Sequence, residues 1–160
     1  MRKLIIFVII GWMSVMTVCA QEFIGNIGYN FKGTKPDGIV LSGAFYEGYG
    51  MLGFHTKFPS SNCEDLRIGV DVGASVAWRN FMLSPYMQAS YIYQTRAKSS
   101  NFGTGLGIQG IVKVVGPVGV FIRYQYTIFP LMPNPFSNGE HNLSTGVSLI
   151  WFLWCVVGFS

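Results

Sequence analysis

The chain has few charged residues. Lys and Arg number 11 and Asp and Glu number 7, so that only 11% of the 160 residues are charged and 50% are hydrophobic. Soluble domains carry about 25% charged residues, which cover the surface that faces water. A chain this poor in charge cannot cover such a surface unless much of it faces lipid. No stripe of Lys and Arg interleaved with aromatic residues is present either, and we therefore expect no nucleic-acid partner.

The N-terminal segment has the composition of a secretory signal peptide. Two basic residues precede an uncharged apolar run that ends at Val18, and the small residue Ala20 follows. Residues 1–20 are therefore predicted to be a cleaved signal peptide, and residues 21–160 to form one domain. Two alternatives stay open, an uncleaved membrane anchor and lipid attachment at Cys19.

Apolar and polar residues alternate along eight segments, which is typical of β-strands with two different faces. Most of the segments reach the roughly 9–11 residues that a tilted strand needs to cross a bilayer, whereas strands of about 5–6 residues are usual in soluble sheets. The predicted strands are Phe23–Phe31, Gly38–Tyr46, Gly48–Lys57, Leu66–Trp78, Phe81–Thr95, Phe102–Val114, Val118–Ile128 and Asn142–Trp154.

The two faces of these strands differ in bulk. Alternate residues from Leu66 to Trp78 are apolar, and the residues between them include Arg67 and Asp71. On the polar face of the sixth strand, glycines occupy three successive positions from Gly103 to Gly107. So little bulk could not fill the core of a soluble sheet, and we expect the apolar faces to point outward to lipid.

The predicted connections alternate in length, as in membrane barrels with short periplasmic turns and longer extracellular loops. The long ones are Lys32–Asp37, Phe58–Asp65, Thr95–Asn101 and Phe129–His141, and the short ones are Glu47–Gly48, Arg79–Asn80 and Val115–Pro117. Aromatic residues gather near strand ends, which fits interfacial girdles or, alternatively, the ordinary β-propensity of aromatic rings.

The last strand supplies a further pattern. Counting back from Phe159, the residues Val157, Leu153 and Trp151 share one face, although Ser160 follows and the opposite face is apolar too. This face resembles the assembly signal of outer-membrane barrels, and a short helical span is the alternative. The whole of residues 21–160 resembles the small eight-stranded outer-membrane β-barrels of Gram-negative bacteria, the OmpA/OmpX-like porin-family barrels. The resemblance implies location in the cell outer membrane, contact with its lipid and recognition by the barrel-assembly machinery.

Inside an eight-stranded barrel the polar side chains should fill the lumen and leave no open pore. Asp71 should pair with a cation such as Arg123 or Arg67, because an isolated buried carboxylate is costly. A narrow ion path is the alternative. The residues predicted to form this lumen network are Lys57, Arg67, Asp71, Gln109, Lys113 and Arg123.

No catalytic or metal-binding pattern is evident, and we expect no cofactor. His55, expected on the inner face of the third strand, and His141, beside the longest loop, lack the spacing of a zinc site. The acids Asp37, Glu64, Asp65 and Glu140 are all expected in loops.

The sequence therefore predicts an all-β, eight-stranded antiparallel up-and-down transmembrane barrel without enzymatic activity. Its external loops, above all Phe129–His141, would meet an extracellular partner, or the barrel would act as a membrane scaffold. The alternative is a secreted or periplasmic soluble barrel that binds a small hydrophobic ligand, as lipocalin-like barrels do.

Cys63 and Cys155 are expected to remain unlinked. Cys63 falls in a predicted long loop and Cys155 after the predicted crossing of the eighth strand, so that the bilayer separates them, whereas a disulfide needs Cα atoms within about 7 Å. Mass spectrometry of non-reduced peptides is the measurement. A Cys63–Cys155 peptide would contradict this topology.

Overall fold

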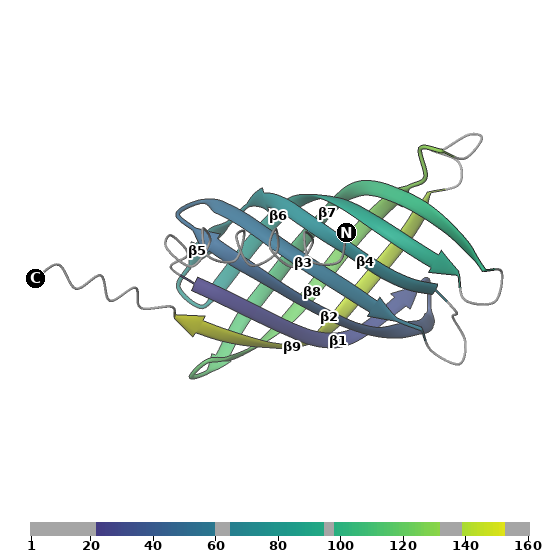
Figure 1. Cartoon of the computed structure of the whole chain (residues 1–160). Coiled ribbons are helices and arrows are strands. Elements are labelled where there is room, and N and C mark those ends of the chain that lie inside the picture. The colour runs from purple at the N-terminus through teal and green to yellow at the C-terminus, as the bar shows by residue number, and fades with distance from the viewer. Residues whose placement is uncertain (1–21, 60–64, 95–97, 132–138, 153–160) are drawn as a thin grey trace, which may run out of the picture.

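The strands close into a barrel (Figure 1). The computed structural model describes residues 22–59, 65–94, 98–131 and 139–152. Neighbouring strands are antiparallel in the order β4-β3-β2-β1-β9-β8-β7-β6-β5, and β4 also pairs with β6, which completes the ring. The strands are β1 Glu22–Lys32, β2 Lys35–Glu47, β3 Gly50–Phe58, β4 Asp65–Ala74, β5 Val76–Trp78, β6 Phe81–Gln94, β7 Ser99–Val115, β8 Val118–Ile128 and β9 Glu140–Phe152.

β4 and β5 are two parts of one barrel strand, because both pair with β6. The ladder is interrupted at Ser75, whose backbone N–H donates to the carbonyl of Tyr49 at 2.7 Å. The prediction of an all-β, eight-stranded antiparallel up-and-down barrel is therefore confirmed. The predicted strand Val118–Ile128 agrees with β8, and the other predicted strands differ from the observed ones by a few residues at their ends.

Two of the predicted long connections are wrong. β1 and β2 continue to a two-residue turn at Gly33 and Thr34, with Lys32 opposite Lys35. Gly33 takes the left-handed conformation at φ 66° that such a turn requires. Likewise β7 begins at Ser99, so that only residues 95–98 connect it to β6. Polar residues at these strand ends resemble a loop in composition, but their backbone groups continue the ladder.

The two ends of the barrel still differ. We call the end with the connections 33–34, 59–64, 95–98 and 129–139 the long-loop end. The opposite end carries the two-residue connections 48–49, 79–80 and 116–117, and we call it the short-turn end. All three connections at the short-turn end are therefore two-residue turns, whereas the long-loop end carries one such turn together with the longest connection (Figure 1).

The outer face of the barrel is apolar. Val72 is 58% exposed, Leu106 63% and Ile122 55%, and these residues come from three different strands. The residues next to them in sequence point inward, because successive side chains of a strand alternate between faces. Within the described ranges, no helix is long and apolar enough to cross a membrane.

Aromatic rings lie across the contact between the first and last strands. The ring of Phe23 on β1 lies 5.7 Å from that of Trp151 on β9 and 4.8 Å from that of Phe45 on β2, measured between ring centroids. The contact with Trp151 adds to the β1–β9 ladder, which runs from Glu22 opposite Phe152 to Phe31 opposite Leu143. Of the predicted assembly signal, Trp151 is described and outward-facing, whereas Leu153, Val157 and Phe159 lie outside the described residues, as do Cys63 and Cys155.

The exposed apolar band predicts a depth-dependent cost of charge. Val72 lies near the middle of its strand and Val76 near the short-turn end, and both point outward. In a bilayer, Val72→Arg should reduce the stability of the folded barrel by about 2–4 kcal/mol more than Val72→Met does, whereas the corresponding difference at Val76 should be about 0–1 kcal/mol. Urea titration of the barrel in lipid vesicles measures both differences, and equal values at the two depths would argue against a lipid-facing band.

Candidate functional site

Polar side chains from opposite sides of the barrel meet in the middle of the lumen. Asp71 on β4, His55 on β3, Arg123 on β8 and Tyr86 on β6 all point inward and are buried. The inward position of each side chain follows from strand alternation, because its sequence neighbours point outward. We call these four residues the central cluster.

Arg123 and Asp71 form a two-pronged ion pair. Nη1 of Arg123 donates to Oδ2 of Asp71 at 2.9 Å, and Nη2 donates to Oδ1 at 3.0 Å. The two residues are only 3% and 2% exposed. Such a fork satisfies both carboxylate oxygens and fixes the orientation of the guanidinium, so that it joins β4 to β8 across the lumen.

His55 and Tyr86 surround this pair. Nδ1 of His55 lies 3.1 Å from Oδ1 of Asp71 and 3.2 Å from Nη2 of Arg123, so that either tautomer finds a partner, as donor to the carboxylate or acceptor from the guanidinium. The guanidinium carbon of Arg123 lies 4.5 Å from the centre of the Tyr86 ring, a cation–π contact. The ring of Tyr86 occupies the space that a side chain at Gly107 would need. Gly107 on β7 therefore makes room for the large side chain of Tyr86 from β6.

A second group lies toward the long-loop end. Arg67 on β4 reaches across to β9, where its Nη2 donates to Oε2 of Glu140 at 2.9 Å, and Lys32 donates to the other oxygen at 2.7 Å. Nη1 of Arg67 and Nε2 of Gln88 both donate to the hydroxyl oxygen of Thr127, at 3.3 and 2.6 Å. We call Arg67, Gln88, Thr127 and Glu140 the upper cluster.

Lys57 is held beside the upper cluster by an acid that was expected in a loop. Its Nζ donates to Oδ2 of Asp37 at 2.6 Å, and Asn30 donates to the same oxygen at 3.0 Å. Asn30 also donates to Oδ1 of Asn142 at 3.2 Å.

The expectation of loop positions for Asp37, Asp65 and Glu140 is wrong, because β2, β4 and β9 extend further than predicted. Glu64 lies outside the described residues.

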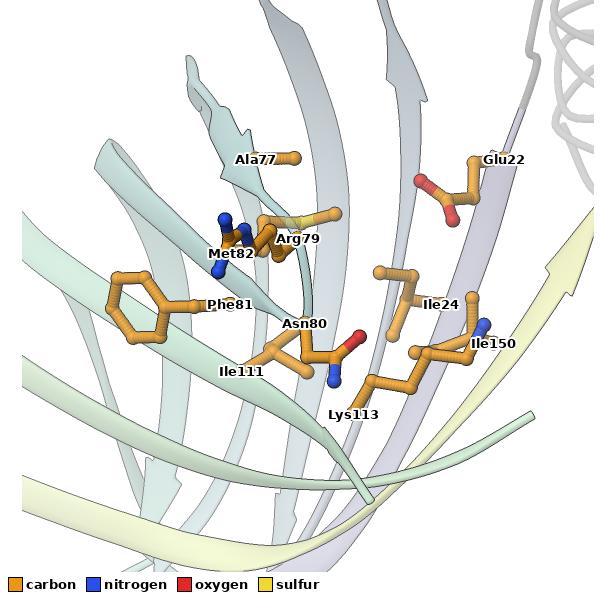
Figure 2. A pocket seen from close by; sticks show the side chains of 10 residues that line it. All are labelled: Glu22, Ile24, Ala77, Arg79, Asn80, Phe81, Met82, Ile111, Lys113 and Ile150. Atoms are coloured by element: carbon orange, nitrogen blue, oxygen red, sulfur yellow. The ribbon is translucent and has the colours of Figure 1, made fainter. Parts of the chain in front are cut away.

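Gln109 and Lys113 lie closer to the short-turn end. Gln109 is buried and donates to the hydroxyl of Tyr46 at 3.4 Å. Lys113 lines a cavity of about 120 Å³ at the barrel mouth together with Glu22 and Arg79 (Figure 2).

Of the two cations expected as partners of Asp71, the structure brings Arg123 into contact with it and not Arg67. It separates Lys113 from both clusters.

Part of the lumen is apolar, a feature that was not predicted from the sequence. Five inward side chains near the short-turn end belong to one packed cluster, and we call them the apolar layer: Ile24, Met51, Ile111, Phe121 and Ile150. Their positions in the alternation already placed them on the inner face. The partners Tyr86 and Glu140 could have been found by the same rule, by extending each alternation to the end of its strand.

No group of three or more His, Cys, Asp or Glu residues in the described part of the chain is arranged to hold a metal ion. Among the described residues, four buried polar atoms lack a hydrogen-bond partner: Nε2 of His55, Nε of Arg67, Oε1 of Gln88 and Nδ2 of Asn142. The hydroxyls of Ser84 and Tyr86 instead interact with Tyr46 and Arg123.

Comparison with known proteins gives the fold and no family. Among solved structures, the chain is similar to one described as "De novo design of transmembrane beta-barrels", with a TM-score of 0.56, 14% identity, and coverage of 82% of this chain and 97% of that chain. The chain has the fold of a transmembrane β-barrel. It also matches Neisserial surface protein A (NspA), with a TM-score of 0.42, 10% identity, and coverage of 80% and 94%. No family model and no curated protein matches, so that membership of the OmpA/OmpX-like group stays a hypothesis.

Removing one partner of the central ion pair should destabilise the barrel. Asp71→Ala leaves the Arg123 charge buried without its carboxylate, which costs about 3–5 kcal/mol when the site is fully desolvated and less where water enters. The double variant Asp71→Leu/Arg123→Leu should recover much of that loss, since no unpaired charge remains. The urea midpoint in detergent micelles measures both effects, and an unchanged midpoint in Asp71→Ala would show that the pair does not contribute.

Proposed function

We propose that the protein is a non-enzymatic barrel of the bacterial outer membrane, which carries surface loops on a scaffold with a filled lumen. The exposed apolar band on its outer face is the observation that supports this proposal most directly. Soluble monomers rarely expose contiguous apolar patches larger than a few hundred Å². Here large apolar side chains are exposed on strands all round the barrel, including Val72, Leu106 and Ile122.

The lumen argues against the alternative of a soluble barrel that binds a hydrophobic ligand. Lipocalin-like barrels hold their ligand in the interior. In this chain charged and polar side chains occupy that space, with Asp71, Arg123 and Arg67 each no more than 3% exposed. A hydrophobic ligand would have to displace paired charges, which is unfavourable.

The same burial supports a non-enzymatic role. His55 and Asp71 form the kind of pair that general acid–base catalysis uses, but Arg123 covers them and His55 is only 2% exposed. A substrate could not approach either group without opening the lumen. The connection 129–139 is the longest one, and we assign contact with an extracellular partner to this loop.

Topology in cells tests the proposal. An epitope tag inserted after Pro135, in the 129–139 connection, should be bound by antibody on intact cells. The matched control is the same tag inserted at the opposite end, between Gly116 and Pro117, which should be bound only after the outer membrane is permeabilised. Release of the untagged protein by osmotic shock, or equal labelling of both tags on intact cells, would contradict the proposal.

A further inference from the structure

The lumen changes character along the barrel axis. The central and upper clusters fill it with hydrogen-bonding groups, whereas the apolar layer near the short-turn end presents hydrocarbon, sulfur and one aromatic ring. The ring of Tyr46 packs in the same cluster, and its hydroxyl accepts a hydrogen bond from Gln109 on the long-loop side. Ile24 lies opposite Ile150 in the β1–β9 ladder, and Ile111 lies opposite Phe121 in the β7–β8 ladder. Four of the five residues of the layer therefore lie on the adjacent strands β7, β8, β9 and β1.

Water has a place to bind on the short-turn side of this layer. The cavity there has a volume of about 120 Å³, and three residues of the layer, Ile24, Ile111 and Ile150, line it (Figure 2). Glu22 and Lys113 also line it and supply charged groups. A water molecule takes about 30 Å³ in the liquid, so that the cavity has room for several.

On the other side of the layer, buried polar atoms call for water. Nε of Arg67, Oε1 of Gln88 and Nδ2 of Asn142 are buried without a hydrogen-bond partner among the described residues. Each such group costs about 1–3 kcal/mol unless a water satisfies it. Arg67 and Gln88 share the hydroxyl of Thr127, so that they line one space.

This space reaches solvent at the long-loop end. Glu140 accepts a hydrogen bond from the buried Arg67, yet its side chain is 20% exposed. Toward the short-turn end, Nε2 of His55 is one more buried polar atom without a partner in the described part of the chain. Unpartnered polar atoms therefore continue from the upper cluster into the central cluster.

We propose that water molecules occupy the gaps between the lumen side chains on both sides of the apolar layer, and that this layer is the barrier that keeps the barrel closed to protons. Narrow hydrophobic constrictions exclude water, and protons move through proteins along continuous chains of water and hydrogen-bonding groups. Along β7 the hydrogen-bonding groups of the lumen stop at Gln109, which donates to the hydroxyl of Tyr46, and Ile111 separates this pair from Lys113 at the cavity. The inference rests on the proposed membrane location, because only a membrane-spanning barrel has two compartments to separate.

A paired substitution tests the barrier. The double variant Ile111→Thr/Phe121→Thr puts two hydroxyls into the layer while it keeps residues of high β-propensity. Its matched control is Val112→Thr/Ile122→Thr, which changes the next residues of the same two strands, both outward-facing. All proteins are reconstituted in phospholipid vesicles that contain a pH-sensitive dye, with potassium and valinomycin to remove the membrane potential. The inward variant should raise proton permeability at least about tenfold over the original chain, and the outward control should not.

The outcomes separate this inference from the proposed function. Heat-modifiable migration in SDS identifies the folded barrel in each vesicle preparation. A folded inward variant with the same proton permeability as the original chain would overturn the inference. If the double variant does not fold, the single pair Ile111→Thr and Val112→Thr must show the same difference, and no difference would overturn the inference. Failure of the original chain to insert into vesicles would instead refute the proposed membrane location.

Discussion

The rest of the structure depends on the hydrogen bonds between the first and last strands. A sheet edge carries unpaired N–H and C=O groups, and in lipid no water can satisfy them, so that only a closed ring of strands is stable there. Ten residue pairs, from Glu22 opposite Phe152 to Phe31 opposite Leu143, join β1 to β9 and remove that edge. The rings of Phe23 and Trp151 lie over one end of this contact and add apolar packing to it.

Closure fixes which residues meet inside. In a small barrel the strands are tilted and staggered, so that side chains from distant strands reach the same level of the lumen. Arg123 on β8 and Asp71 on β4 meet in this way, and so do Arg67 on β4 and Glu140 on β9. These cross-lumen ion pairs are strong only while both partners are present, since an unpaired charge at that depth is costly. The contents of the lumen therefore depend on the ring, and they in turn hold opposite walls of the ring together.

Strand alternation made most of the fold predictable from the sequence, because a two-residue period assigns each side chain to a face independently of the other strands. It placed Arg67, Asp71 and Arg123 inside and Val72 outside. Ion-pair partners were not predictable, because the choice of Arg123 over Arg67 for Asp71 depends on the stagger between strands. Asp37 and Glu140 were misassigned to loops because polar residues at a strand end have the composition of a loop. The apolar layer was missed for a related reason: Ile111 and Phe121 form a layer only once their heights along the barrel axis are known.

The two kinds of lumen content serve opposite requirements. Ion pairs across the lumen attract strongly only where little water surrounds them. The polar atoms of these residues that have no protein partner, such as Nε of Arg67, need water. An apolar layer has neither requirement and packs without water. Its position at one end lets the polar clusters take water from the long-loop end, where Glu140 is partly exposed, without a continuous path through the barrel. Separating the two along the axis therefore allows one narrow lumen to be both charged and closed.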